Sequence, residues 1–103
     1  MDDVFQKAMA LSGVGADWLE PLKILAGKES SMNPRAKNPV SVGGEHATGL
    51  MQTLPSTFQQ HAMTGYGDIY NPLDNLLASI SYIKGRYGHP SVALQGWEQR
   101  GGY

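Results

Sequence analysis

The segment from Asn71 to Gly88 is the feature of this chain that most restricts its fold. Leucine, isoleucine and tyrosine side chains follow Asn71-Pro72 at positions 73, 76, 77, 80, 83 and 87, before Gly88 and Pro90 end the pattern. Apolar residues that recur every three or four positions lie on one face of an α-helix, and that face must be buried against other elements. The pattern therefore predicts a core helix over 73–87.

Weaker patterns predict further helices around this one. Residues 3–11 carry apolar side chains at helical spacing and stop before Gly13, so we expect a short helix that packs at the periphery. A second helix is expected to begin near Asp17. Its apolar face would carry Trp18, Leu22 and Leu25.

The remaining segments predict loops, one more helix and a tail. Residues 31–48 hold Asn-Pro and Gly-Gly pairs and are expected to form a loop with a small hairpin. A helix is expected over 55–63, anchored by Phe58. Residues 89–103 read as a tail or linker. The sequence thus predicts a mainly α fold of four or five short helices around one core.

Composition restricts the function classes. With 103 residues, 41% of them hydrophobic and 17% charged, the chain suits one globular domain. It has no cysteine, which excludes disulfides, thiolate zinc sites and a cysteine nucleophile. Its net charge is −1 and its basic residues are scattered, so we expect neither nucleic acid nor membrane as a partner. We also find no signal peptide, no apolar run of membrane-spanning length, no histidine zinc motif and no phosphate loop, and expect no cofactor.

Glu29 is the unusual member of the nine carboxylates. It follows Leu25 by four positions, so a helix that reaches this far places its carboxyl on the apolar face. Desolvation there would raise its pKa, as a general acid requires, because an unperturbed glutamate is protonated only about once in 500 at pH 7. The alternative is a helix that frays after Gly27 and leaves Glu29 solvated.

The predicted core helix has a second face. Tyr82 lies opposite the apolar stripe, and Asn75 shares its side. The tyrosine hydroxyl is suited to orient a carboxyl, and the amide to brace a neighbouring loop; the alternative is that both are ordinary surface residues. Four further aromatic residues are candidates either for stacking on sugars or for ordinary packing: His61, Tyr66, Tyr70 and Trp97.

Several motifs occur in an ordered set. They are Glu29-Ser30, Asn33-Pro34, Gly49-Leu50-Met51-Gln52, Asn71-Pro72, Asn75 and Tyr82. Over about 17–88 this set resembles the soluble lytic transglycosylase (SLT) domain, which has a lysozyme-like fold related to goose-type lysozyme. The variant here looks most like the wall-degrading domain of phage tail proteins, including tape-measure proteins. The resemblance implies one domain over 1–103 with a core at 17–88, monomeric in isolation and part of a larger virion tail protein that acts at the bacterial cell wall.

The resemblance also implies chemistry. Glu29 would be the only catalytic acid and base, and the substrate would be peptidoglycan, cut between N-acetylmuramic acid and N-acetylglucosamine with formation of a 1,6-anhydro ring. Ser30 would brace the loop beside Glu29, Tyr82 would hydrogen-bond its carboxyl, and Gly49 would let the backbone approach the sugar. The other residues expected to line the substrate site are Leu50, Met51, Gln52, Asn75, Tyr70 and His61.

Two alternative functions remain at this level, a hydrolytic muramidase of the same fold and a non-catalytic wall-binding module. Goose-type lysozymes carry aspartates that can hold a hydrolytic water before the Gly-Leu-Met-Gln segment. Residues 30–48 here contain no aspartate and only Glu45, so we expect transglycosylation unless Glu45 comes close to the site. Ser79 stands where many members have glycine, which puts the width of the cleft at Tyr82 in question.

Overall fold

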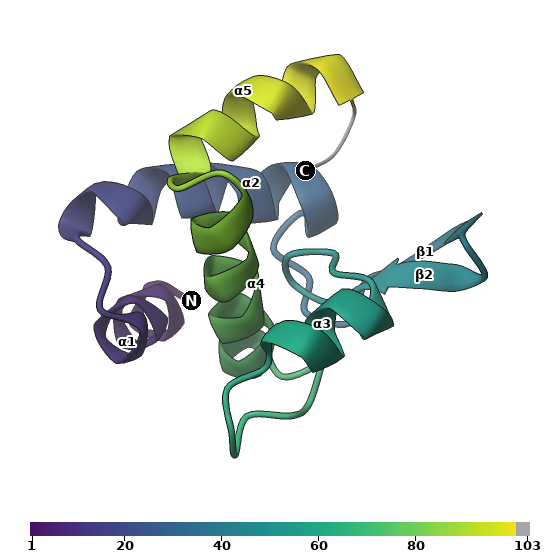
Figure 1. The fold of residues 1–103 in the computed structure, drawn as a ribbon, viewed down its shortest axis with the longest axis horizontal. Helices are drawn as coiled ribbons and strands as arrows, with labels where there is room; N and C mark the ends of the chain where they lie inside the picture. The colour runs from purple at the N-terminus through teal and green to yellow at the C-terminus, as the bar shows by residue number, and fades with distance from the viewer. Residues whose placement is uncertain (101–103) are drawn as a thin grey trace.

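The fold is mainly helical, as the sequence predicts. The computed structural model describes residues 1–100, with the side chains of all of these except Glu98 and Arg100. The elements in chain order are α1 (Asp2–Ser12), the 3-10 helix η1 (Ala16–Trp18), α2 (Leu19–Ser30), β1 (Lys37–Val42), β2 (Glu45–Thr48), α3 (Pro55–His61), α4 (Pro72–Arg86) and α5 (Pro90–Arg100). In Figure 1, α4 runs through the middle of the molecule, α2 crosses its upper end, α5 lies above α2, and the β1–β2 hairpin projects to one side.

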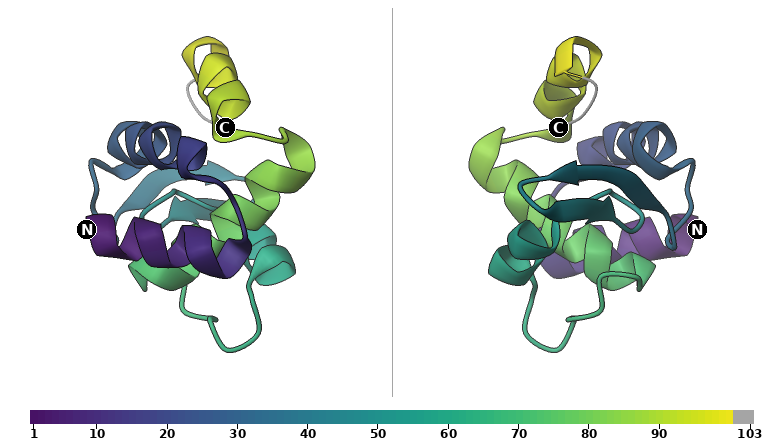
Figure 2. Two further views of the ribbon diagram at one scale, coloured as in Figure 1. Left: turned by 90° about the vertical axis from the view of Figure 1, so that its left-hand side faces the viewer. Right: turned by 90° about the vertical axis from the view of Figure 1, so that its right-hand side faces the viewer.

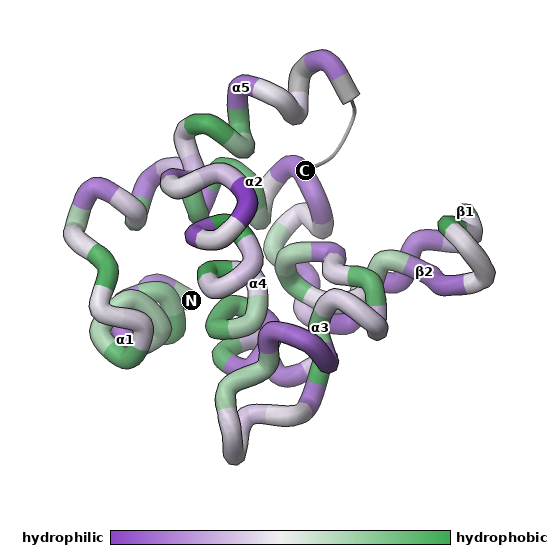
Figure 3. Tube along the Cα trace, in the orientation of Figure 1, coloured by the Kyte–Doolittle hydropathy of each residue, from purple (hydrophilic) through white to green (hydrophobic). Residues whose placement is uncertain are grey.

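The core forms where α1, α2 and α4 meet. Figure 3 shows hydrophobic stretches on these helices around the centre of the molecule. The side chains with no exposed surface include Phe5, Leu22, Leu25, Leu50, Met51, Leu76 and Ile83. The expectation that the first helix packs at the periphery is wrong, because Phe5 and Ala8 are fully buried and α1 packs along α4. The stripe on α4 faces this core as predicted.

Helix α2 continues through Gly27 and ends at Ser30. Ser31 adopts a left-handed conformation with φ 55°, and its N–H donates to the Gly27 carbonyl at 3.0 Å. Such a left-handed cap satisfies carbonyl groups that the last helical turn leaves open. The helix therefore includes Glu29, and the alternative of a helix that frays after Gly27 is wrong.

The segment 31–48 contains the expected hairpin. Strands β1 and β2 pair antiparallel, with Ser41 opposite His46 and Val42 opposite Glu45. All six residues of β1 are exposed, and the right-hand view of Figure 2 shows the two strands in front of the rest of the molecule. Thr48 at the end of β2 pairs with Thr53 in an isolated bridge, so the chain between them forms a closed loop.

The predicted tail is a helix as far as the structure describes it. α5 spans Pro90–Arg100, whereas 101–103 lie outside the described residues. Ala93 is fully buried, and Leu94 and Trp97 pack against the core. Pro90 begins this helix instead of merely ending the preceding one, as proline at a first helical position can. Among residues 1–100 no helix has both the length and the apolar character needed to cross a membrane.

Candidate active site

Glu29 lies in the last turn of α2, on the same face as the buried Leu22 and Leu25, and its side chain is half-buried. Its Oε2 accepts a hydrogen bond from Nε1 of Trp97 at 3.1 Å. A carboxylate that accepts a bond from an indole N–H is held in one orientation, because the planar ring fixes the direction of the donor. The side chain is thus both partly shielded from water and restrained.

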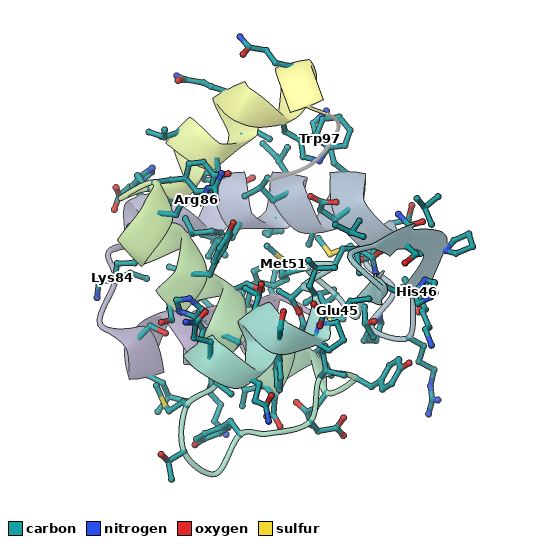
Figure 4. All side chains as sticks on the ribbon, turned by 45° about the vertical axis from the view of Figure 1, so that its right-hand side comes forward. Glu45, His46, Met51, Lys84, Arg86 and Trp97 are labelled. Carbon is teal, nitrogen blue, oxygen red and sulfur yellow. The ribbon has the colours of Figure 1, made fainter. Side chains whose placement is uncertain are left out.

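Trp97 is a site residue whose bond to Glu29 the sequence did not predict. It comes from α5, and Figure 4 shows it over the end of α2. Nζ of Lys28 lies 4.7 Å from the centre of its ring, a cation–π distance. The signal that would have found it is the spacing of Pro90, Ala93, Leu94 and Trp97, which repeats at helical intervals.

Ser30 joins the end of α2 to the loop Gly49–Gln52, hereafter the GLMQ loop. Its Oγ donates to the Leu50 carbonyl at 2.6 Å and accepts from the Asn33 N–H at 3.2 Å. Ser30 is 9% exposed. The predicted bracing role is therefore confirmed, but its burial and its bonds direct the hydroxyl to the protein, so direct contact with substrate is not its role.

Asn75 holds the GLMQ loop from the other side. Its Oδ1 accepts from the Met51 N–H at 2.9 Å, and its Nδ2 lies within hydrogen-bond distance of three oxygens, at 3.0 to 3.2 Å. These oxygens are the carbonyls of Thr48 and Ile69 and the hydroxyl of Thr53. Asn75 has no exposed surface, so the loop-bracing interpretation is confirmed, and its assignments as a surface or substrate-contacting residue are wrong.

Three residues of the GLMQ loop have roles other than those expected. Leu50 and Met51 have no exposed surface, so they anchor the loop in the core and do not line the substrate site; Figure 4 shows Met51 in the interior. Gly49 has φ 86°, and a Cβ there would overlap Asn75 and lie 2.5 Å from the Ile69 carbonyl oxygen. These internal contacts explain why position 49 is a glycine, and no close approach of a sugar is needed to explain it.

Gln52, Tyr82 and His61 come together on one side of the loop. Gln52 and Tyr82 line a hollow of about 80 Å³ with Thr53, Leu54 and Thr57. Nε2 of Gln52 donates to the carbonyls of Ala36 and Gly49 at 3.1 and 3.0 Å. The rings of His61 and Tyr82 meet edge to face with 5.6 Å between their centres. The hydrogen bond expected between Tyr82 and Glu29 stays a prediction.

Tyr70 lies in a separate hollow at the hairpin. This hollow, of about 350 Å³, is bounded by residues of both strands together with Pro55, Ile69 and Tyr70. Tyr70 is 43% exposed, which leaves its ring open to a ligand. It does not line the hollow that Gln52 and Tyr82 share.

Glu45 is engaged at the start of α3. Its two carboxylate oxygens accept from the N–H and the hydroxyl of Ser56, each at 2.7 Å. Figure 4 places Glu45 beside α3, away from Trp97. An anion at the first turn of a helix is favourable because the unpaired N–H groups there carry partial positive charge. The contacts with α3 thus explain the carboxylate of Glu45 without a role in catalysis.

The structure also places Ser79 and the histidine and acidic side chains of the described residues. Ser79 has no exposed surface and does not line the hollow that Tyr82 bounds, so its effect on the width of the cleft stays a prediction. Within the described part of the chain, no three histidine or acidic side chains gather closely enough to hold a metal ion.

A comparison with known protein families assigns the chain to one of them. The family described as "Transglycosylase SLT domain" matches residues 5–95. The chain belongs to this family. The SLT domain includes α5 through residue 95, which agrees with the packing of that helix on α2. Membership indicates a lysozyme-like fold and a transglycosylase that acts on glycosidic bonds of peptidoglycan.

A curated relative of this SLT domain is the "Uncharacterized protein YqbO" of Bacillus subtilis (strain 168), which is 46% identical over 74 residues. The match covers 69% of this chain but 5% of the relative, so the chain corresponds to a small part of that protein. No solved structure matches the chain significantly.

Proposed function

We propose that this SLT domain cleaves the β-1,4 bond between N-acetylmuramic acid and N-acetylglucosamine, with Glu29 as the catalytic residue. The observation that carries the proposal is the half-buried carboxyl of Glu29, restrained by Trp97 beside a loop that two internal braces hold in place. Such a carboxyl is suited to proton transfer, since its position is set before substrate arrives.

The reaction needs only one carboxyl. Protonated Glu29 donates its proton to the glycosidic oxygen while the bond from that oxygen to C1 of the muramyl unit breaks and positive charge builds on the muramyl ring. The N-acetylglucosamine unit leaves with a free hydroxyl group. The acetamido oxygen of the substrate stabilises that charge, so no second protein nucleophile is needed. Glu29, now ionised, takes the proton of the C6 hydroxyl, whose oxygen attacks C1 and closes the 1,6-anhydro ring. The proton count balances, and Glu29 returns to its protonated form.

The hydrogen bonds that Glu45 accepts from Ser56 favour transglycosylation over hydrolysis. A muramidase of this fold requires a second group that positions water, and Glu45 is the one carboxylate among residues 30–48. Ser56 engages both of its oxygens, so holding a water for attack would require breaking those bonds. The rival outcome, a hydrolytic muramidase, is therefore disfavoured.

The product analysis tests the reaction directly. We expect digested cell-wall fragments to carry anhydro ends, whose mass is lower by one water than that of the reducing ends left by a muramidase. Mass spectrometry measures the difference, with a muramidase digest of the same walls as the reference. Fragments with reducing ends would assign hydrolysis to the domain, and wall binding without any fragments would assign the non-catalytic role.

Trp97 provides a second test, because it is the residue that restrains the carboxyl. Trp97→Phe keeps an aromatic ring beside Lys28 but removes the N–H that bonds to Glu29. We expect kcat to fall about tenfold, as loss of one hydrogen bond to a charged group predicts. Wall-clearing rate per folded molecule is the measurement.

Trp18→Phe is the matched control for this variant, since Trp18 lies before α2 at the opposite end from Glu29. It removes the same atoms from a buried indole, so it should lower stability without lowering the rate of the folded protein. Equal rates for wild type and Trp97→Phe would remove Trp97 from the site.

We propose in addition that the domain opens the cell wall locally as part of a phage tail protein. The resemblance of its motifs to wall-degrading tail domains and its match to a small part of a much longer relative support this context. Antibodies against the domain should label purified phage particles released by the bacterium that encodes it, and particles without the label would contradict the assignment.

A further inference from the structure

Arg86 at the end of α4 is surrounded by aromatic rings. Its Cζ lies 5.4 Å from the centre of the Tyr87 ring and 6.0 Å from that of Tyr82. The two tyrosine rings meet edge to face, with 6.4 Å between centres. Guanidinium groups within about 6 Å of aromatic rings gain cation–π attraction, so two such contacts restrain the side chain.

Arg86 forms no ion pair with the residues whose side chains the structure describes. Lys23, by contrast, pairs with Asp2 at 3.0 Å. The electrostatic interaction with Tyr82, followed by that with Tyr87 and hydrogen bonding to both, raises the pKa of Arg86 above its ordinary value. The position in the last turn of α4 explains why a cation is favourable here, but it does not explain the two rings that hold it.

Arg86 also lies near the hollow that Gln52 and Tyr82 line. Tyr82, which touches Arg86 on one side, lines the hollow with Gln52 on the other. Gln52 belongs to the GLMQ loop, which Ser30 ties to the end of α2 beside Glu29. One aromatic ring therefore separates the guanidinium from the hollow beside the braced loop.

We propose that Arg86 binds a carboxylate of the stem peptide that a muramyl unit of the substrate carries. This inference rests on the proposed function, because it takes the glycan to run past Tyr82. In peptidoglycan the glycan chain itself is uncharged, and the free carboxylates belong to the peptides. A guanidinium presents paired N–H groups that match the two oxygens of a carboxylate, and the two rings hold it ready for that contact. Arg86 would thus make the domain prefer strands that still carry peptides.

Binding to two soluble ligands tests this preference. The ligands are muramyl oligosaccharides with intact stem peptides and, as the peptide-free ligand, N-acetylglucosamine oligosaccharides of the same length, which carry neither peptides nor the lactyl carboxylates that removal of a peptide would expose. All proteins carry Glu29→Gln so that the ligand is not cleaved, and calorimetry measures Kd. We expect Arg86→Gln to weaken binding of the peptide-bearing ligand about tenfold and to change Kd of the peptide-free ligand less than twofold.

Lys7→Gln is the matched control, because it removes one positive charge from an exposed position of α1 and should change neither Kd. Thermal unfolding of each variant checks that it is folded. Equal weakening for both ligands, or no weakening for either, would overturn the role of Arg86. If the Glu29→Gln protein binds neither ligand and the wild type releases no wall fragments, the proposed function itself fails, which is a distinct result.

Discussion

Glu29→Gln should reduce the rate of wall clearing by at least about 10²-fold, within the range of 10² to 10⁴ that proton transfer by a positioned group contributes. The amide has nearly the same shape as the carboxyl, and its oxygen still accepts from Nε1 of Trp97, so the fold should be unchanged. What the variant lacks is the proton that the glycosidic oxygen requires. Loss of turbidity of purified cell walls measures the rate, and circular dichroism verifies the fold.

Glu20→Gln is the matched control for this experiment. Glu20 lies in the first turn of the same helix and is exposed. Its replacement by glutamine removes one negative charge, as Glu29→Gln does. It should clear walls at the rate of the wild type. If Glu29→Gln clears walls as fast as Glu20→Gln, Glu29 takes no part in proton transfer and the proposed mechanism is wrong.

The parts of the fold that could be predicted are those that the pattern of residues within one segment determines. The stripe on α4 and the residues Leu22 and Leu25 on α2 report the helical period directly, so both helices were predicted with their buried faces. The end of α2 was ambiguous because Gly27 lowers helix stability by about 1 kcal/mol. Packing of α2 against α1 and α5 offsets a cost of that size, and this packing is invisible in the local sequence.

The direction in which a loop residue points could not be predicted. Leu50 and Met51 stand in a motif typical of the substrate site, yet both are buried, because Ser30 and Asn75 bind backbone groups of the loop and draw it against the core. The resemblance to the family implied that the loop lies beside Glu29. It did not indicate which side chains of the loop face the substrate.

The bond between Trp97 and Glu29 was missed for a different physical reason. Pro90 follows Gly88 closely, and together they end the pattern of α4, so the chain beyond them resembled a linker. Proline has two meanings at a helix boundary, since its fixed φ also suits the first turn of a new helix. The contact of Trp97 with Glu29 joins residues 68 positions apart, and only the packing of α5 on α2 brings them together.

Asn75→Ala should lower the free energy of unfolding by about 3 kcal/mol or more. The substitution leaves the Met51 N–H and the Ile69 carbonyl without the amide, whereas the Thr48 carbonyl still accepts from the Thr53 N–H. Each buried polar group left unpaired costs about 1 to 3 kcal/mol. In a domain of this size the midpoint of thermal unfolding should fall by roughly 10 to 20 °C. Urea and thermal unfolding followed by circular dichroism measure both quantities.

Two further variants separate bracing from the mere loss of an asparagine. Asn38→Ala removes an exposed side chain whose Oδ1 accepts from the Val40 N–H at 2.9 Å, and its effect should stay within about 0.5 kcal/mol. Asn75→Asp retains the acceptor for the Met51 N–H but sets a carboxylate against two carbonyls, so it too should be strongly destabilising. If Asn75→Ala costs no more than Asn38→Ala, the amide does not hold the GLMQ loop, and the position of that loop beside Glu29 must have another cause.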